Sequence, residues 1–311
     1  MVIGSGIIIG GKFRIERPVS HAGGTAAVYL ASLTDNPKLK VAVKFAKSDS
    51  TGPMPEDMLL DREADLLSRW NWRHPGIVRI YPIPLDEREV AYSRKAVELT
   101  GRPTFMVLEY LSGGSLAENF KKIRDFPLGW KLETFYQILV AVSHLHQMGF
   151  GHRDLKPENI VFRDSISPKL IPNPVLVDFA LASNGKDQYM IVEKAFTASY
   201  ASPERYLRNM GYDVPPYPLE EDIWSLGVIL YEIITGIHLF RGNEDSVRTT
   251  IIKGNINPDI DEKYADNNSY TAKKLSSIIR YMLGPDPRDR PSIKQLVLAL
   301  EELFPPPRLT L

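Results

Sequence analysis

The sequence predicts an α+β protein with a small β-rich part carrying one main helix, followed by a larger helical part. In the first hundred residues, short runs with strand-like patterns are bounded by glycine, proline or asparagine, and one helical pattern lies at 57–70. After Gly113-Gly114 the patterns become mainly helical. We expect one domain over 1–311, divided into a small lobe at about 11–109, a hinge at about 110–114 and a larger lobe at about 115–304.

Periodicity and capping residues predict the individual elements. Strands are expected at 13–16, where apolar and charged residues alternate, and at the apolar runs 26–31, 40–45, 77–80 and 104–109. The charged stretch 86–102 is expected to be a surface excursion. Helices of the larger part are expected at 116–123, 130–147, 221–235, 245–253, 271–283 and 292–303. Ser115, Thr271 and Ser292 are the candidate caps.

Composition excludes several classes of function. The 38 basic and 38 acidic residues cancel, so the basic surplus that a nucleic-acid backbone requires is missing, and we expect no nucleic-acid partner. No cysteine is present, which excludes disulfides, zinc–thiolate sites and thiol catalysis. No apolar run approaches the roughly 18 residues that span a bilayer, so we expect no membrane segment in this chain and a cytoplasmic location.

Two polar segments carry the chemistry. The first reads Gly-His-Arg-Asp-Leu-Lys-Pro-Glu-Asn over 151–159 and places an acid, a base and an amide within six positions. The second, Val-Leu-Val-Asp-Phe-Ala over 175–180, is an apolar run that ends in an acid. Upstream, the apolar run 41–43 ends in Lys44, and Glu63 follows nineteen residues later on the helical pattern.

Together these segments resemble the eukaryotic-like (Hanks-type) Ser/Thr protein kinases. The resemblance covers about 13–303, nearly the whole chain, and includes the His-Pro-Gly-Ile-Val segment at 74–78. It implies a bilobal protein-kinase-like fold and transfer of the γ-phosphate of ATP to Ser/Thr hydroxyls of a protein substrate. The implied cofactor besides ATP is Mg²⁺, with Mn²⁺ as an alternative.

The resemblance also implies a role for each catalytic position. Asp154 would orient or accept the proton of the acceptor hydroxyl, and Lys156 would contact the transferred phosphate. Lys44 would hold the α- and β-phosphates and pair with Glu63. Lys156 is typical of Ser/Thr rather than tyrosine kinases. Three further residues complete this set: Asn159 and Asp178 as the metal ligands, and Thr197 as the buttress of Asp154 and Lys156.

The resemblance further predicts an adenine pocket and a scaffold. Leu108 would gate the back of the pocket, Glu109 and Leu111 would offer backbone groups to adenine, and the ring would be sandwiched by Val28, Ala42 and Val161. In the scaffold, Glu204 would pair with Arg290, and Asp222 would brace the catalytic loop. A surface ion pair is the alternative interpretation of such charges.

Three departures leave the activity open. Of the three glycines in the family's phosphate-covering loop, only Gly23 is present, because His21 and Ala26 replace the other two; we expect weaker nucleotide affinity. Ala180 stands where the family has glycine and is expected to restrict the hinge after Asp178. Arg153 precedes Asp154, and in the family an arginine at this position often binds a phosphate on the activation segment. The hydroxyls there, at Ser183, Tyr189 and Ser199, include no threonine in the usual place.

Three functions therefore stay in view. The first is an active Ser/Thr protein kinase, a transferase, because the polar residues Lys44, Glu63, Asp154, Asn159 and Asp178 are all present. The second is a pseudokinase, a nucleotide-binding scaffold with weak or no transfer. The third, a kinase of small molecules, is disfavoured by Ser-Pro-Glu at 202–204, since that segment serves protein substrates. The sequence leaves the oligomeric state unknown.

Overall fold

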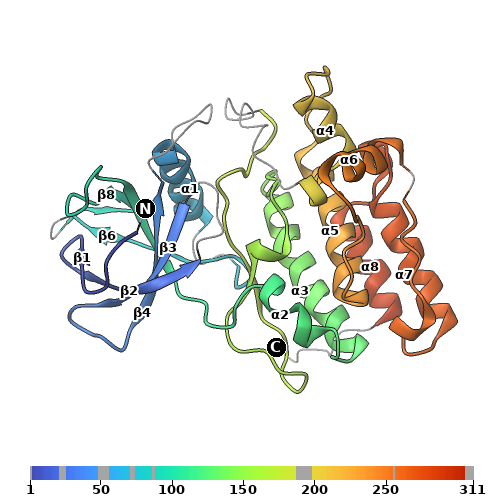
Figure 1. The fold of residues 1–311 in the computed structure, drawn as a ribbon, viewed down its shortest axis with the longest axis horizontal. Coiled ribbons are helices and arrows are strands. Elements are labelled where there is room, and N and C mark those ends of the chain that lie inside the picture. Colours follow the sequence, from blue (N-terminus) through green and yellow to red (C-terminus); the bar gives the residue numbers. More distant parts are fainter. Residues whose placement is uncertain are drawn as a thin grey trace. The chain divides into compact units, whose positions relative to one another are not determined.

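The computed structural model describes residues 2–20, 26–47, 56–70, 74–85, 88–186, 198–254 and 256–304. The chain divides into two compact units, Met1–Ser112 with Asp178–Ala180 and Gly113–Val177 with Leu181–Leu311. The largest sheet belongs to the smaller unit, and helices α2 to α8 belong to the larger one (Figure 1). The predicted α+β class, with a small β-rich lobe and a larger helical lobe, is confirmed.

The described strands of the small unit form a seven-stranded antiparallel sheet in the order β1-β2-β3-β4-β9-β5, with β8 also paired to β9. Its strands are β1 (Ile8–Ile9), β2 (Phe13–Ser20), β3 (Ala26–Leu33), β4 (Lys40–Ala46), β5 (Ile80–Tyr81), β8 (Ser93–Lys95) and β9 (Thr104–Glu109). A separate pair is formed by β6 (Ile83–Pro84) and β7 (Val90–Ala91). The predicted surface excursion at 86–102 thus contains two short strands.

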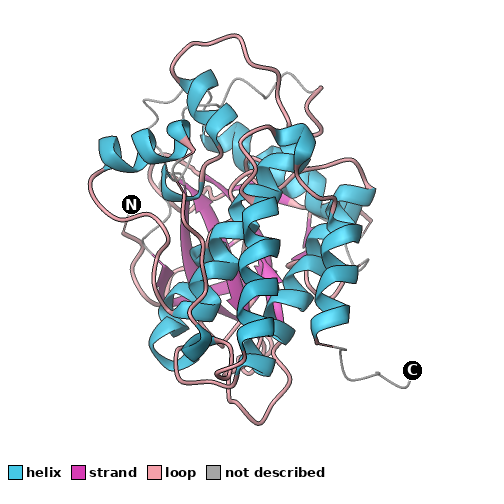
Figure 2. Cartoon of the chain, turned by 90° about the vertical axis from the view of Figure 1, so that its right-hand side faces the viewer, coloured by secondary structure: helices cyan, strands magenta, loops and turns pink. Residues whose placement is uncertain are grey.

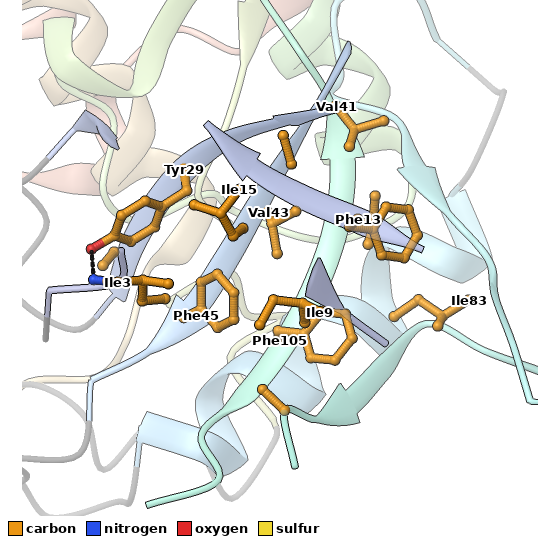
Figure 3. Packing of buried hydrophobic residues seen from close by; sticks show 14 residues of the cluster. Ile3, Ile9, Phe13, Ile15, Tyr29, Val41, Val43, Phe45, Ile83 and Phe105 are labelled. Carbon is orange, nitrogen blue, oxygen red and sulfur yellow. Dashed lines mark hydrogen bonds between the residues drawn. The ribbon is translucent and has the colours of Figure 1, made fainter. Parts of the chain in front are cut away.

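One face of the central strands is covered by an apolar cluster. Tyr29, Val43 and Phe45 alternate with the residues of the other face, as the two-residue period of a strand requires. The N-terminal segment closes the cluster with Ile3 and Ile9, and the Ile3 amide donates to the Tyr29 hydroxyl at 3.1 Å (Figure 3). This cover was not predicted, because strand β1 has only two residues.

Helix α1 (Glu56–Trp70) lies against strands β4, β5, β8 and β9. Its apolar residues recur at helical spacing, so that Leu59, Leu60, Leu66 and Leu67 are buried. Glu63 shares this buried side, although it is an acid. A buried charge requires a partner, and for Glu63 that partner is Lys44, described below.

The larger unit is mainly helical (Figure 2). Helix α3 contacts α5 and α8, and α5 also contacts α7. Its helices are α2 (Leu116–Ile123), α3 (Leu128–Gln147), α4 (Pro203–Asn209), α5 (Pro218–Thr235), α6 (Glu244–Lys253), α7 (Ser269–Met282) and α8 (Ile293–Leu303). A two-stranded sheet joins β10 (Ile160–Phe162) to β11 (Pro174–Leu176). In the described ranges, no helix combines the length and the apolar character that a membrane span needs.

Two of the three predicted caps are confirmed. Ser115 and Ser292 each form a capping box with the residue three positions on, Glu118 and Gln295. The prediction for Thr271 was wrong, since α7 begins earlier and Asn268 is its cap, accepting from the Thr271 amide at 3.0 Å. Both residue types can cap, and only the structure shows which of them precedes the first turn.

Candidate functional site

Among the residues that the structure describes, the predicted functional residues lie in both units, and those of the small unit centre on Lys44. This lysine lies within β4, between the buried residues Val43 and Phe45, and only 5% of it is exposed. Its Nζ lies 2.6 Å from Glu63 Oε2 and 2.8 Å from Asp178 Oδ1. The structure therefore brings together the lysine, the helix acid and the acid that follows β11, which are 134 residues apart at the extremes.

The two acids of this cluster stabilise the Lys44 charge, although burial and the nearby Asp178 carboxylate raise the pKa of Glu63 above its ordinary value. Burial disfavours the Lys44 ammonium, but the carboxylates of Asp178 and Glu63 outweigh that effect and raise the pKa of Lys44 above its ordinary value of 10.5. The lysine is therefore a cation throughout the neutral range. Its partner Glu63 also accepts from the Phe179 amide at 3.0 Å, through Oε1, so both of its oxygens are engaged.

The segment Asp178–Ala180 is fixed to the small unit by three contacts besides the ion pair. The Phe179 amide reaches Glu63, and the buried Phe179 ring meets Trp70 edge-to-face with centroids 5.7 Å apart. Arg62 donates to the Ala180 carbonyl at 3.3 Å. Asp178 itself adopts a left-handed backbone with φ of 65°, whereas Ala180 does not. The methyl of Ala180 is thus compatible with this conformation.

The predicted adenine-pocket residues of the small unit share one face of the sheet. Val28 is opposite Lys44 in the β3–β4 register, and Ala42 is opposite Leu108 in the β4–β9 register. Residues directly opposite in an antiparallel pair point to the same side, and Ala42 and Lys44 are two positions apart on one strand. Glu109 is the last residue of β9, Leu111 follows two positions later, and both are buried.

The larger unit holds the second cluster, in the loop 151–159. Lys156 Nζ lies 2.8 Å from Asp154 Oδ2, and the Asn159 side-chain amide donates to the same oxygen at 2.9 Å and to the Asp154 carbonyl at 2.8 Å. Two donors thus orient one oxygen of the Asp154 carboxylate. The backbone carbonyl of Asn159 accepts from the Val177 amide at 3.0 Å, and this hydrogen bond joins the loop to the segment between β11 and Asp178. Val161 follows in β10, opposite Val175.

Asp222, which is fully buried in α5, holds the backbone of this loop. Its Oδ2 accepts from the His152 amide at 2.7 Å and lies 2.9 Å from His146 Nε2, and its Oδ1 accepts from the Arg153 amide at 2.8 Å. His152 Nδ1 accepts from the Asp154 amide at 3.3 Å, so Nε2 carries the proton shared with Val177 O at 3.1 Å. Both ring nitrogens of His152 are thus engaged with the backbone of the loop and of Val177.

Gly151 begins the loop for a steric reason. A Cβ at this position would lie 2.2 Å from the Pro218 carbonyl oxygen, closer than any side chain tolerates. The same glycine exchanges two backbone hydrogen bonds with Ser183, at 2.8 and 3.0 Å. The start of α5 and the segment after Ala180 thus meet the loop where its first residue has no side chain.

Comparison with known proteins agrees with this geometry. The family model of the protein kinase domain matches residues 22–299. The chain belongs to the protein kinase family. A related protein is the probable serine/threonine-protein kinase MARK-C of Dictyostelium discoideum, which is 28% identical over 261 residues. The match covers 83% of this chain and 29% of that protein, so the kinase chain spans under a third of its relative's length.

The predicted family and the kinase-like fold are thereby confirmed, and the relative's type agrees with the predicted enzyme class, a serine/threonine kinase. Two predicted positions of the kinase, Gly23 and Thr197, lie outside the described residues, as does Tyr189. The remaining site residues are described, and their roles stay predictions.

A buried ion pair supports the kinase scaffold in the larger unit. Arg290 donates to both oxygens of Glu204, at 2.7 and 2.8 Å, and the Arg290 side chain is fully buried. The same guanidinium donates to the carbonyls of Glu220 and Gly284 and lies over the Trp224 ring. The pairing predicted from the Ser-Pro-Glu segment is present, and the alternative of a surface ion pair is wrong.

Some residues that contact these clusters were not identified from the sequence. His146 contacts Asp222, Trp70 packs on Phe179 and Arg62 holds Ala180, yet none of them belongs to a motif that the sequence singled out for such a role. Glu221 was missed as well. Its position beside Asp222 and the unusual Glu-Glu-Asp run at the start of α5 were the signals that could have identified it.

Proposed function

We propose that this chain is an active protein kinase that transfers the γ-phosphate of ATP to Ser/Thr hydroxyls of protein substrates, with Mg²⁺ as the metal. The observation that carries the proposal is the buried Lys44 ammonium between the carboxylates of Glu63 and Asp178. A cation that is held in place by two acids and stays charged in the neutral range suits the binding of phosphate oxygens.

The face of the sheet that carries Lys44 supports adenine binding. Val28, Ala42 and Leu108 offer apolar surface on the same face, with Val161 as the proposed counterpart in the larger unit. The Glu109 amide donates to the Arg79 carbonyl at 2.9 Å, so the Glu109 group that would meet adenine is its carbonyl. The Leu111 backbone would supply the second hydrogen bond, and Gly23 would lie over the phosphates.

The donor set fits magnesium. Mg²⁺ prefers hard oxygen ligands, and Asp178 offers a carboxylate whose side chain is 31% exposed. The Asn159 amide nitrogen is engaged with Asp154, so the group it would offer is its oxygen. Bound there, the metal would neutralise phosphate charge and align the γ-phosphate. Mn²⁺ has similar ligand preferences and is the alternative ion.

Asp154 is the proposed residue for the acceptor hydroxyl. Lys156 and Asn159 both donate to its Oδ2, which fixes the orientation of the carboxylate that would accept the proton of an incoming hydroxyl. Lys156 would then also contact the transferred phosphate, with Thr197 as buttress. This lysine, together with the serine/threonine type of the relative, favours Ser/Thr over Tyr as the acceptor.

Phosphate transfer from radiolabelled ATP to a generic protein substrate tests the proposal, with Asp154→Asn measured beside the wild type. We expect transfer that requires Mg²⁺ or Mn²⁺ and falls by at least about a hundredfold in Asp154→Asn. Asp213→Asn, an exposed change of the same kind, is the matched control and should leave the rate unchanged. Equal incorporation by the wild type and Asp154→Asn would instead favour the pseudokinase.

A further inference from the structure

A buried cluster of one acid and three arginines lies beside the catalytic loop. The Glu221 carboxylate is 3.5 Å from Arg153 Nε and 3.8 Å from Arg205 Nη1, and it accepts from Arg208 Nη2. The side chains of all four residues are less than a tenth exposed. Glu221 and the three arginines come from α5, the catalytic loop and α4.

The Glu221 carboxylate stabilises this arrangement. Arginine does not lose its proton in proteins, so three buried guanidiniums that approach one another repel strongly unless an anion lies among them. Glu221 supplies such an anion, because both of its oxygens face the cluster: Oε1 contacts Arg208, and Oε2 contacts Arg153 and Arg205.

Arg153 links the cluster to the catalytic residue. Its amide donates to Asp222, its carbonyl accepts from Arg205 Nη1, and its side chain meets Glu221. Its backbone is left-handed, with φ of 65°, which a residue other than glycine adopts only when its surroundings hold it there. Asp154 is the next residue, so a change in the backbone at Arg153 moves Asp154 directly.

We propose that Glu221 is a positioning residue for phosphoryl transfer. Its carboxylate gathers the guanidiniums of Arg153, Arg205 and Arg208 and so holds Arg153, and through it Asp154, in the geometry for transfer. Because this anion belongs to the chain itself, the loop is held without an added phosphate group. This inference rests on the proposed function, since it assigns a residue to the same reaction.

A double-mutant cycle on kcat tests the positioning role, with Glu221→Gln and Arg153→Met made singly and together. If Glu221 acts through Arg153, Glu221→Gln lowers kcat by about tenfold or more in the wild-type background and by no more than about twofold when Arg153→Met is present. The KM for ATP should change by less than about twofold, because the nucleotide-binding residues are not touched. Glu220→Gln, the same change one position earlier in α5, should leave kcat unchanged.

Folding is checked by circular dichroism and thermal melting. If Glu221→Gln does not fold, Glu221→Asp replaces it in the same cycle, because aspartate keeps the charge and only shortens the reach. Equal losses of kcat in both backgrounds, or no loss at all, would overturn the positioning role.

A second arm tests independence from phosphate. Wild-type protein treated with a broad-specificity phosphatase, and shown by mass spectrometry to carry no phosphate, should keep its kcat within about twofold. A loss of about tenfold or more would overturn that part of the proposal. If untreated wild type shows no Asp154-dependent transfer, the proposed function fails and this role with it. If the wild type transfers phosphate and Glu221→Gln transfers it at the same rate, the positioning role fails while the proposed function stands.

Discussion

Arg290 holds Glu204 through two parallel hydrogen bonds, at 2.7 and 2.8 Å, inside the larger unit of the kinase. The two residues are 86 positions apart, and the pair joins the start of α4 to the turn before α8. A bidentate arginine–carboxylate pair is geometrically specific. In a buried site, the attraction between the two charges offsets the free energy of removing each of them from water.

Arg290→Met is therefore expected to lower the free energy of unfolding by about 3–5 kcal/mol, since Glu204 would keep a buried charge with no arginine beside it. Urea denaturation followed by circular dichroism measures this loss. Arg288→Met is the control, because its pair with Asp286 lies at the surface, where solvent screens the charges, and its loss should be much smaller. Similar losses in the two variants would show that burial does not set the value of the Glu204 pair.

Lys44→Met should weaken binding of Mg·ADP by about ten- to a hundredfold, because this factor corresponds to the free energy of a hydrogen bond to a charged group. Isothermal titration calorimetry with the purified chain measures the affinity. The matched control is Lys40→Met, on the same strand, whose partner Glu16 is at the surface. Unchanged affinity in Lys44→Met would remove this lysine from the proposed nucleotide site.

The ratio of wild-type to Lys44→Met affinity should be independent of pH between about pH 6.5 and 9. The pKa of folded Lys44 lies above 10.5, so the ammonium and its ion pairs are fully present below that value and are lost only as pH rises through the folded-state pKa. Calorimetry at several pH values measures the ratio. A ratio that falls steadily within this range would mean that Lys44 titrates there.

Asp222→Asn should lower kcat by about ten- to a hundredfold with little change in the KM for ATP. Asparagine keeps one acceptor oxygen, but its amide group faces either the His152 or the Arg153 N–H, so one of the two backbone hydrogen bonds is lost. Steady-state kinetics and hydrogen exchange of the loop amides measure the two effects. Normal kcat with fast-exchanging amides would separate loop order from catalysis.

Much of this architecture could be predicted because the informative signals are local. The apolar runs and caps predict most helices within about three residues, since periodicity and capping depend on neighbours in sequence. The motif residues Lys44, Glu63 and Asp178 could be matched to a known family and do meet in the structure. Helix α4 was missed, as its seven residues are too few for a clear period.

The residues that could not be predicted act across long sequence distances. His146 and Asp222 are 76 positions apart, and Glu221 and Arg153 are 68 apart. Neither pair has a spacing rule, because the fold alone brings α3, α5 and the loop together. The N-terminal cover of the sheet by Ile3 and Ile9 was missed for the same reason, since two-residue strands carry no period.

Ala180→Gly should leave the fold intact but loosen the segment after Asp178. Ala180 has no positive φ, so its methyl fits the observed backbone and limits the alternatives open to the chain. We expect glycine to lower the free energy of unfolding by about 0.4–1 kcal/mol, mainly through the greater entropy of the unfolded chain. Thermal melting and denaturant titration measure this.

The same substitution tests whether Ala180 biases the position of Asp178. The Asp178–Lys44 ion pair requires the observed backbone, and a glycine populates other conformations in which that contact is absent. Affinity for Mg·ADP should therefore fall by a few-fold, roughly in proportion to the fraction of molecules that leave the observed state. Ala182→Gly, two residues further on, is the matched control for a general loss of stability. Equal affinity and equal activity in Ala180→Gly and the wild type would show that the alanine exerts no such bias.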